Sequence, residues 1–313
     1  MRYYSLNQYC KDTFGEKIYR LSLDAGMTCP NRDGLLSDKG CFFCSAGGSG
    51  DFAEKTTLSI YDQIESAKKQ VQSKTKCNKF IAYFQAYTNT YAPIEKLREI
   101  FTEAISKDDI VALSIGTRSD CLGDDVLLLL QELNQIKPVW VELGYQSMHN
   151  ASLASMNTHT SLEQFDRAVH SLNDKDIPVI AHVILGLPNE TKEMMLESVK
   201  HLADIKVSGI KLQLLHVLKD TVLAQIYTAN PFPIFELDEY CDFVIDCLEI
   251  LPPDMVIHRL TGDGPRNLLV APLWSTDKKR VLNTINKKLK DRDTYQGRLY
   301  KKENTDGRTI YNI

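Results

Sequence analysis

Short apolar runs alternate along this chain with longer stretches in which apolar residues recur every three or four positions. The short runs predict strands, and the recurring positions predict amphipathic helices, as where Ile60, Ile64 and Ala67 fall on one helical face. Strands are predicted over 17–24, 80–85, 110–115, 139–143, 177–185, 210–217 and 255–260. Helices are predicted over 58–72, 93–106, 124–136, 160–173, 190–207, 237–251 and 277–289. The fourth helix would begin at a capping box, Thr160-x-x-Glu163.

Six strand–helix pairs in strict alternation favour a parallel sheet, and strands that are apolar on both faces indicate helices on both sides. This leaves an open doubly wound sheet or a barrel, complete or partial. No G-x-G-x-x-G follows the first strand, whereas polar residues follow several strands, where barrels carry their chemistry. These polar strand ends are Gln85–Asn89, Thr117–Asp120, Glu142–Gln146, His182 and His216. No linker divides the chain, so we expect one catalytic domain with a C-terminal extension.

Composition and charge narrow the class of protein. With 313 residues, 43% of them hydrophobic and 25% charged, the chain is neither a disordered protein nor a fibre. The net charge of −4 gives no sign of a nucleic-acid partner. Residues 278–302, however, carry an excess of eight positive charges with two interleaved tyrosines, a pattern suited to phosphates and bases. The RNA-binding candidates are Lys279, Arg280, Lys287, Lys288, Lys290 and Arg292; the alternative is a solvated helix face.

Apolar runs and cysteine content together predict a cytoplasmic protein. The first ten residues contain no apolar core of signal-peptide length, and the longest aliphatic run, 126–130, is too short to span a membrane. We therefore expect no membrane partner and reduced thiols. Eight cysteines are too sparse for a disulfide scaffold, and cysteines that cluster in such a chain suggest a metal or catalysis.

Three of the cysteines lie in one loop, CPNRDGLLSDKGCFFC. Eleven residues separate Cys29 from Cys41, and two separate Cys41 from Cys44, so the loop brings a third thiolate back to a Cys-x-x-Cys turn. Thiolates suit zinc or iron–sulfur centres, but a structural zinc site needs four ligands and no histidine precedes His149. Three cysteines would leave one iron of a [4Fe–4S] cluster open to another ligand. Iron–sulfur, zinc and coincidental thiols all remain possible from spacing alone.

The five other cysteines are scattered. Cys10 and Cys77 are expected to be structural, and Cys241 and Cys247 do not share a helical face and are expected in the core. Cys121 follows the third predicted strand, on the expected catalytic side, and is the additional thiol with a candidate catalytic role.

The three-cysteine loop after a first strand, with the aromatic Phe43 before the last cysteine, resembles the radical S-adenosylmethionine (SAM) enzymes. The long first spacing is similar to the YtqA/YhcC or MnmL-like branch, which is related to the catalytic subunit of Elongator. The sequence segments that resemble this branch are GMTCPNRDG (26–34), FQAYTNTYAP (84–93), SIGTRSDCL (114–122), WVELGYQS (140–147), HVILGLP (182–188) and LTGDGPRNLLVAPLW (260–274). The resemblance implies an α/β fold: a partial (β/α)6 barrel of the TIM type over 1–235, and a C-terminal α/β extension with a basic helix and tail over 236–313.

The same resemblance implies the cofactors and their contacts. Cys29, Cys41 and Cys44 would hold a [4Fe–4S] cluster, whose open iron the methionine part of SAM would chelate. Cleavage of SAM would give methionine and a 5′-deoxyadenosyl radical. The implied cofactor contacts are Phe43, Gln85, Ala86, Tyr87, Thr88, Thr117, Arg118, Glu142, Gln146, His182 and Gly186. The catalytic candidates are Cys121, Arg118 and His182.

These contacts have structural alternatives. Glu142 and Gln146 could instead cap the next helix, His182 could be a satisfied core histidine, and Gly186 could only form a turn.

One departure from the family pattern concerns the carboxylate of SAM. Related enzymes often carry an arginine for this group where the present chain has Met156–His159. We expect Arg118, Arg167 or His159 to replace it.

The resemblance suggests tRNA as the substrate, with conversion of carboxymethylaminomethyl-uridine at the wobble position to aminomethyl-uridine. It also implies a flavodoxin- or ferredoxin-type electron donor. The alternatives are a radical SAM enzyme acting on another RNA or on a small molecule, or a non-catalytic zinc-binding RNA module.

Overall fold

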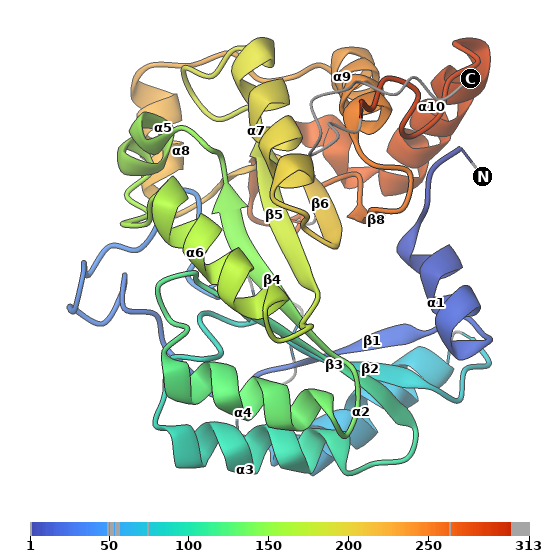
Figure 1. The fold of residues 1–313 in the computed structure, drawn as a ribbon. Helices are drawn as coiled ribbons and strands as arrows, with labels where there is room; N and C mark the ends of the chain where they lie inside the picture. Colours follow the sequence, from blue (N-terminus) through green and yellow to red (C-terminus); the bar gives the residue numbers. More distant parts are fainter. Residues whose placement is uncertain are drawn as a thin grey trace.

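A parallel sheet of seven strands forms the centre of the protein. The computed structural model describes residues 2–48, 50, 53, 57–73, 75–262 and 264–301. The strands are β1 (Tyr19–Leu23), β2 (Phe80–Phe84), β3 (Ile110–Thr117), β4 (Val139–Gln146), β5 (Val179–Leu185), β6 (Gly209–Leu214) and β8 (Val256–Arg259). They are hydrogen-bonded in that order, and the sheet curls into a partial barrel (Figure 1). The predicted α/β partial barrel is confirmed.

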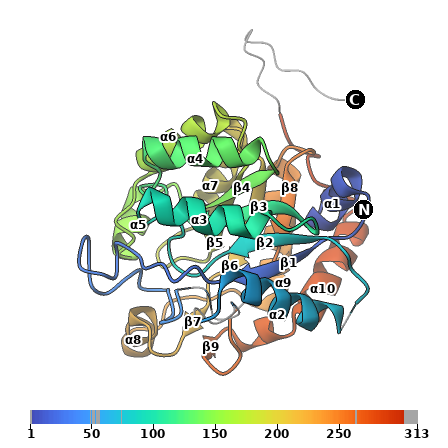
Figure 2. The same ribbon diagram turned by 90° about the horizontal axis from the view of Figure 1, so that it is seen from below.

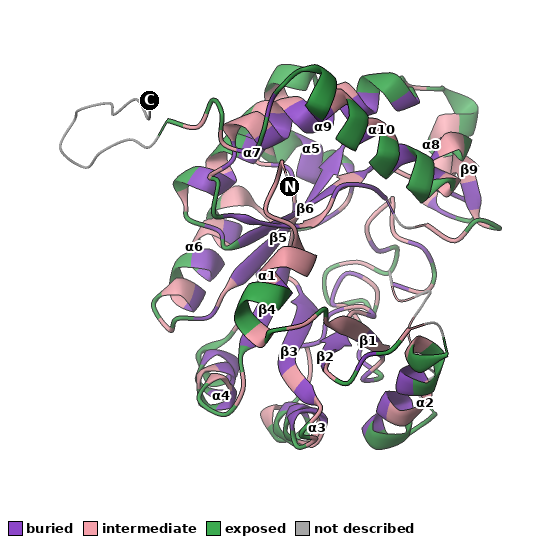
Figure 3. Cartoon of the chain, turned by 90° about the vertical axis from the view of Figure 1, so that its right-hand side faces the viewer, coloured by how far each residue is buried: buried purple, intermediate pink, exposed green. Residues whose placement is uncertain are grey.

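Helices cover the outer face of the sheet (Figures 1 and 2). They are α2 (Ile60–Gln72), α3 (Ile94–Ile105), α4 (Asp124–Asn134), α6 (Leu162–Asn173) and α7 (Lys192–Asp204). Each buries one face and exposes the other (Figure 3), as the apolar periodicity predicts. All of the predicted strands and helices are present, with ends that differ by a few residues.

Within the described residues, three α-helices, one 3₁₀ helix (Leu273–Thr276) and one strand pair were missed by the periodicity. These are α1 (Leu6–Phe14), α5 (Asn150–Ser155), α8 (Val222–Ala229), and the antiparallel pair β7 (Val217–Leu218) and β9 (Leu269–Ala271). All are short, so each contains too few turns or alternations to give a periodic signal.

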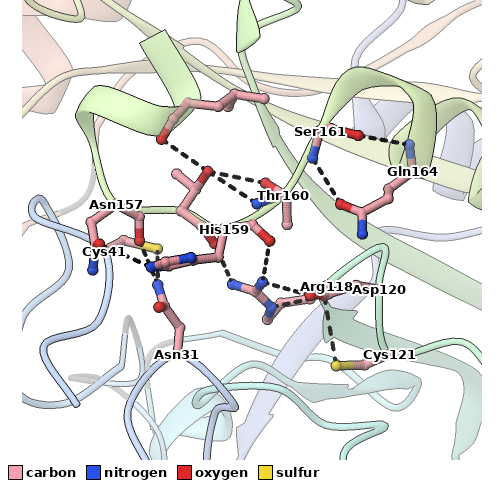
Figure 4. Close-up of polar contacts among 12 residues, drawn as sticks. Asn31, Cys41, Arg118, Asp120, Cys121, Asn157, His159, Thr160, Ser161 and Gln164 are labelled. Carbon is pink, nitrogen blue, oxygen red and sulfur yellow. Dashed lines mark hydrogen bonds and ion pairs between the residues drawn. The ribbon is translucent and has the colours of Figure 1, made fainter. Parts of the chain in front are cut away.

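The predicted capping box at Thr160 and Glu163 is wrong by one residue. Ser161 is the N-cap of α6: its hydroxyl accepts the N–H of Gln164, and the Gln164 side chain accepts the N–H of Ser161 (Figure 4). The Thr160 hydroxyl instead donates to the hydroxyl of Thr158, so it is not available to the helix.

Side chains on the inner face of the sheet form layers, because successive residues of a strand point to opposite sides. The layer nearest the amino ends of the strands is apolar and contains Ile81, Ala112, Trp140 and Ile180. Helix α1 packs beneath it and places Tyr9 against Trp140, with ring centroids 5.7 Å apart. The next layer along the same strands is polar and contains Tyr83, Ser114, Glu142 and His182. The interior therefore changes from apolar to polar toward the carboxyl ends.

The predicted C-terminal extension is joined closely to the barrel. Its strand β8 pairs with β6, and its helices α9 (Leu237–Ile250) and α10 (Lys278–Asp291) pack against each other. The chain after α10 reaches the N-terminal segment, where the Gln296 N–H donates to the carbonyl of Arg2 and the Gln296 side chain accepts from the N–H of Tyr4. The rest of the predicted tail, residues 302–313, lies outside the described residues.

Within the described ranges, no helix combines the length and the apolar character that a membrane span requires.

Candidate functional site

A cavity of about 270 Å³ lies where the carboxyl ends of the barrel strands meet the cysteine loop. Most of the predicted cofactor residues line it: Cys29, Cys41, Phe43, Cys44, Gln85, Tyr87, Thr88, Thr117, Arg118, Glu142, Gln146 and His182. Ala86, Gly186 and Cys121 are not among its lining residues. The polar strand ends and the cysteine loop, which are far apart in sequence, are thus brought to one place.

Asn31 fixes the cysteine loop to the segment before α6. Its side-chain N–H groups donate to the carbonyl of Asn157 at 2.6 Å and to the sulfur of Cys41 at 3.4 Å (Figure 4). The Asn157 side chain donates in return to the carbonyl of Gly40 at 2.8 Å. This reciprocal pair of contacts holds Cys41 at the cavity.

Tyr87 joins the same loop to the end of β2. Its hydroxyl donates to the carbonyl of Ala46 at 2.6 Å, and its N–H donates to the carbonyl of Gly48 at 2.9 Å. The ring lies so close to Gly48 that a Cβ there would come within 2.3 Å of it, and Gly48 has a φ of +59°. Only glycine fits at this position.

The three loop cysteines lie together at the wall of the cavity. All three are half-buried and outside any disulfide, and burial raises the pKa of Cys41 to about 12, so a metal must displace its proton. Among the described residues, no three Cys, His, Asp or Glu side chains lie close enough to share one metal ion. In a four-iron cluster each cysteine binds a different iron, and the N–H contact from Asn31 to Cys41 is of the kind that tunes such clusters.

Arg118 is the one candidate for the SAM carboxylate that lines the cavity. Asp120 binds its guanidinium with two contacts of 2.8 and 2.7 Å, and the carbonyls of Thr158 and His159 accept further N–H groups (Figure 4). The His159 ring is engaged by Asn157, and Arg167 is exposed on α6. Arg118 therefore lies where it could reach the carboxylate of SAM, but most of its N–H groups already have acceptors.

Cys121 lies outside the cavity. It lines a neighbouring surface hollow with Asp120, whose carboxylate lies 3.7 Å from its sulfur. Burial and this carboxylate raise the pKa of Cys121 to about 12, so the thiol is neutral at pH 7. Neither its place nor its charge state supports the catalytic role considered from sequence.

Glu142 lies in the barrel interior and does not cap a helix, so that alternative is wrong. Its buried carboxylate accepts from Ser114 at 2.9 Å and contacts His182 Nε2 at 2.8 Å and Arg20 at 3.2 Å; it also pairs with Lys211. Burial raises the pKa of Glu142, but Lys211, Arg20 and the hydrogen bond from His182 hold it well below its usual 4.5. The same contact gives His182 a hydrogen-bond partner, as the core-histidine alternative expects, while the residue also lines the cavity.

Lys211, Arg20, Tyr83 and Arg259 belong to this interior and were not predicted. Lys211 is buried and donates to the Tyr83 hydroxyl at 3.1 Å. Burial, opposed by Glu142 and assisted by the two arginines, lowers the pKa of Lys211 to about 7. The available signal was a charged residue inside an otherwise apolar strand, as in IKLQLLHV and KIYRLSLD.

The predicted RNA-binding residues of α10 divide into two groups. Lys288 and Arg292 pair with acidic residues of α9: Lys288 with Asp242 at 2.9 Å, and Arg292 with Asp242 and Asp246 at 2.7 and 2.8 Å. These two cations attach α10 to α9.

The second group faces solvent. Lys279, Arg280 and Lys287 line a shallow groove along α10, and Lys290 is also exposed. Lys279 also lines a hollow of about 690 Å³ that shares Gln85 and Arg259 with the main cavity. A basic surface thus leads toward the site.

Comparisons with known proteins agree with this site. The models of the Radical SAM superfamily and of the Radical_SAM C-terminal domain match residues 29–202 and 207–291. The chain is 44% identical over 301 residues to protein YtqA of Bacillus subtilis, covering 96% of this chain and 94% of that protein. It is 24% identical over 163 residues to the tRNA uridine(34) acetyltransferase of Methanocaldococcus jannaschii, covering 51% and 30%.

A solved structure supports the fold. Elp3 of Methanocaldococcus infernus, with its N-terminus deleted, superposes with a TM-score of 0.68 at 19% identity, over 89% of this chain and 64% of that one. The predicted resemblance is confirmed by the family matches and by YtqA. With the three cysteines, the strand ends and the partial barrel gathered around one cavity, the chain belongs to the radical SAM superfamily of enzymes.

Proposed function

We propose that this enzyme modifies the wobble uridine of tRNA, converting carboxymethylaminomethyl-uridine to aminomethyl-uridine. Superfamily membership implies SAM and an iron–sulfur cluster. The observation that carries the proposal is the continuity between the cysteine-lined cavity and the hollow that reaches the exposed cations of α10. The relationship to a tRNA uridine(34) acetyltransferase supports the choice of tRNA.

Cys29, Cys41 and Cys44 are the proposed ligands of a [4Fe–4S] cluster. A bound cluster would supply one electron for the reductive cleavage of SAM, and the organic radical formed would take a hydrogen from the carbon between the amine and the carboxylate. The substrate radical would then return one electron to the oxidised cluster and add water, so that the carbon–nitrogen bond breaks and the two carbons leave as glyoxylate. We propose a flavodoxin- or ferredoxin-type protein as the source of the electron. The contacts of Asn31, Asn157 and Tyr87 hold the loop in shape for the cluster.

The other residues of the cavity are proposed to bind and orient SAM. Gln85, Tyr87 and Thr88 follow β2 directly above the barrel, next to the cysteine loop. His182 is neutral at physiological pH, because burial and Lys211 lower its pKa to about 4. It is therefore suited to hydrogen bonding and not to charge pairing. Arg118 keeps its guanidinium at the wall of the cavity through Asp120.

Nucleoside analysis tests the proposed function directly. We expect the anaerobically purified enzyme to contain iron and to cleave SAM when reduced. We expect tRNA from cells that lack the gene to accumulate carboxymethylaminomethyl-uridine and to lose aminomethyl-uridine, with the purified enzyme restoring the product. A colourless protein with stoichiometric zinc would instead favour the zinc-binding RNA module. SAM cleavage with unchanged tRNA nucleosides would favour another substrate.

The exposed cations of α10 give a separate prediction about tRNA binding. Replacing Lys279, Arg280 and Lys287 with Ala should weaken tRNA binding roughly tenfold or more, because the variant neutralises fewer phosphates and releases fewer counterions. The salt dependence of binding should become shallower by about two to three units. Filter binding at several salt concentrations measures both quantities.

The matched control removes the same charge elsewhere. Lys11, Lys96 and Lys200 are exposed on α1, α3 and α7, and their triple Ala variant should bind tRNA like wild type. SAM cleavage without tRNA should be unchanged in both triple variants. Equal tRNA affinity in the two variants would remove α10 from the proposed tRNA surface.

A further inference from the structure

Asn31 is a buried residue that contacts the middle part of the cysteine loop twice. Its side-chain Nδ2 donates to the sulfur of Cys41 at 3.4 Å and to the carbonyl of Asn157 at 2.6 Å (Figure 4). Its own backbone carbonyl accepts the N–H of Gly40, the residue before Cys41, at 2.6 Å. An N–H donor is therefore held against one of the three sulfurs that would bind the cluster.

The carbonyl of Asn157 fixes the orientation of this amide. Turning the Asn31 amide over would bring its Oδ1 atom against that carbonyl, and two acceptors cannot form a hydrogen bond with each other. Nδ2 therefore points to Cys41, and Oδ1 is left buried without a hydrogen-bond partner among the described residues. An unsatisfied buried acceptor costs free energy, so the arrangement keeps the contact to sulfur at the expense of stability.

The cysteine loop does not depend on the Asn31 side chain alone for its position. The N–H of Phe42 donates to the carbonyl of Met156 at 3.0 Å, and the Asn157 side chain donates to the carbonyl of Gly40 at 2.8 Å. These two contacts fix the residues on either side of the middle cysteine. The contact from Asn31 to the sulfur is thus added to a loop that is already anchored, so its electronic effect can be separated from a structural one.

A hydrogen bond to a cluster sulfur acts differently on the two oxidation states. Reduction adds one negative charge to a cluster, and the cysteine sulfurs carry part of it. An N–H donor stabilises an acceptor more strongly when the acceptor is more negative, and such bonds are among the features that set cluster potentials. Because Asn31 is buried, bulk water competes little with its N–H groups. The contact should therefore favour the reduced state.

We infer that the Asn31 amide raises the reduction potential of the cluster bound through Cys41, an inference that rests on the proposed function. Asn31 is a positioning residue, because it acts through Cys41 and is not among the residues that line the cavity. A higher potential makes the cluster easier to reduce by a protein donor of the flavodoxin or ferredoxin type. The amide therefore sets how strong a reductant the enzyme requires.

The test is a redox titration of the anaerobically reconstituted protein without SAM, followed by electron paramagnetic resonance of the reduced cluster. Asn31→Leu removes both donors at nearly constant volume. Its reduction should become about three- to tenfold less favourable, which moves a one-electron potential by about 30–60 mV to more negative values. Asn31→Asp keeps the size, lacks the N–H groups and adds negative charge beside the sulfur, so its potential should move the same way by at least as much.

The matched control loosens the loop without removing the contact to sulfur. Asn157→Gly deletes the side chain that donates to the carbonyl of Gly40 and keeps the backbone carbonyl that orients Asn31. Glycine also suits the φ of +55° at this position. The potential of this variant should equal that of wild type, because Cys41 keeps its N–H donor. If Asn31→Leu does not retain a cluster, Asn31→Asp carries the test.

The contrary outcomes are distinct. An unchanged potential in an Asn31 variant that retains its cluster overturns the inference, as does an equal shift in Asn157→Gly, which would trace the effect to loop anchoring. Loss of the cluster from both Asn31 variants also overturns it, because the amide would then serve assembly of the site. If wild type binds no iron–sulfur cluster, the proposed function fails together with the inference. If wild type binds the cluster and cleaves SAM, unchanged potentials in the variants refute the inference alone.

Discussion

Replacing Cys44 with Ala should abolish both iron binding and SAM cleavage. Cys44 is one of three half-buried thiols in the loop, and the described part of the protein offers no further cysteine along the cavity wall. Even groups that only support a ligand change metal affinity roughly 10- to 100-fold, so loss of a ligand should exceed that. Iron analysis, visible absorbance and a deoxyadenosine assay after anaerobic reconstitution measure the effect.

The control for this variant is another cysteine. Cys10 is buried between α1 and the sheet, on the opposite side of the barrel from the cavity. Cys10→Ala should keep its iron and its SAM cleavage, at a modest cost in stability. Retained iron and turnover in Cys44→Ala would contradict the cluster assignment.

Replacing Glu142 with Ala should destabilise the protein more than any surface change. The substitution leaves the buried Lys211 and the half-buried Arg20 without their carboxylate and removes the acceptor of Ser114. Breaking a buried ion pair by removing one partner typically costs about 3–5 kcal/mol. Urea unfolding of the protein as purified gives the free energy of unfolding and tests this expectation.

An exposed ion pair provides the comparison. Glu132 pairs with Arg98 at the surface, with both side chains more than half exposed, so Glu132→Ala should change stability by less than about 1 kcal/mol. Similar losses in the two variants would mean that the interior charges are solvated.

Lowering the pH should reduce the folding stability that the Glu142 carboxylate contributes. Its pKa in the folded protein lies well below 4.5, so the unfolded chain takes up a proton first as pH falls. Stability from this carboxylate is therefore complete above about pH 4.5 and is lost progressively below it. The difference in unfolding free energy between wild type and Glu142→Gln should shrink over the same range.

The order of strands and helices could be predicted from periodicity because each long element buries one continuous face. The cysteine loop could be recognised because its three cysteines are close in sequence. The interior network could not: Lys211, Arg20 and Glu142 were visible as charges within apolar runs, but their meeting depends on the register and curvature of the sheet. The sequence alone does not show which charged side chains of different strands meet inside the barrel.

The basic C-terminal region shows the same limit for charge. The sequence shows an excess of eight positive charges over 278–302. It does not show that Lys288 and Arg292 form ion pairs with acidic residues of α9. The positive charge available to a partner is smaller than this excess, because Lys288 and Arg292 are engaged in ion pairs that join α10 to α9. The exposed remainder, including Lys279 and Lys287, is what the tRNA prediction uses.

The contacts between the two ends of the described chain have a consequence for folding during synthesis. The carbonyl of Tyr4 accepts from Ile257, and Gln296 binds the backbone of both Arg2 and Tyr4. The segment before α1 thus cannot complete its pairing until residue 296 has left the ribosome. Closing such long loops is entropically slow, so the nascent barrel should expose its amino end until late in translation. Chaperone binding at that stage would therefore favour the apolar layer around Trp140.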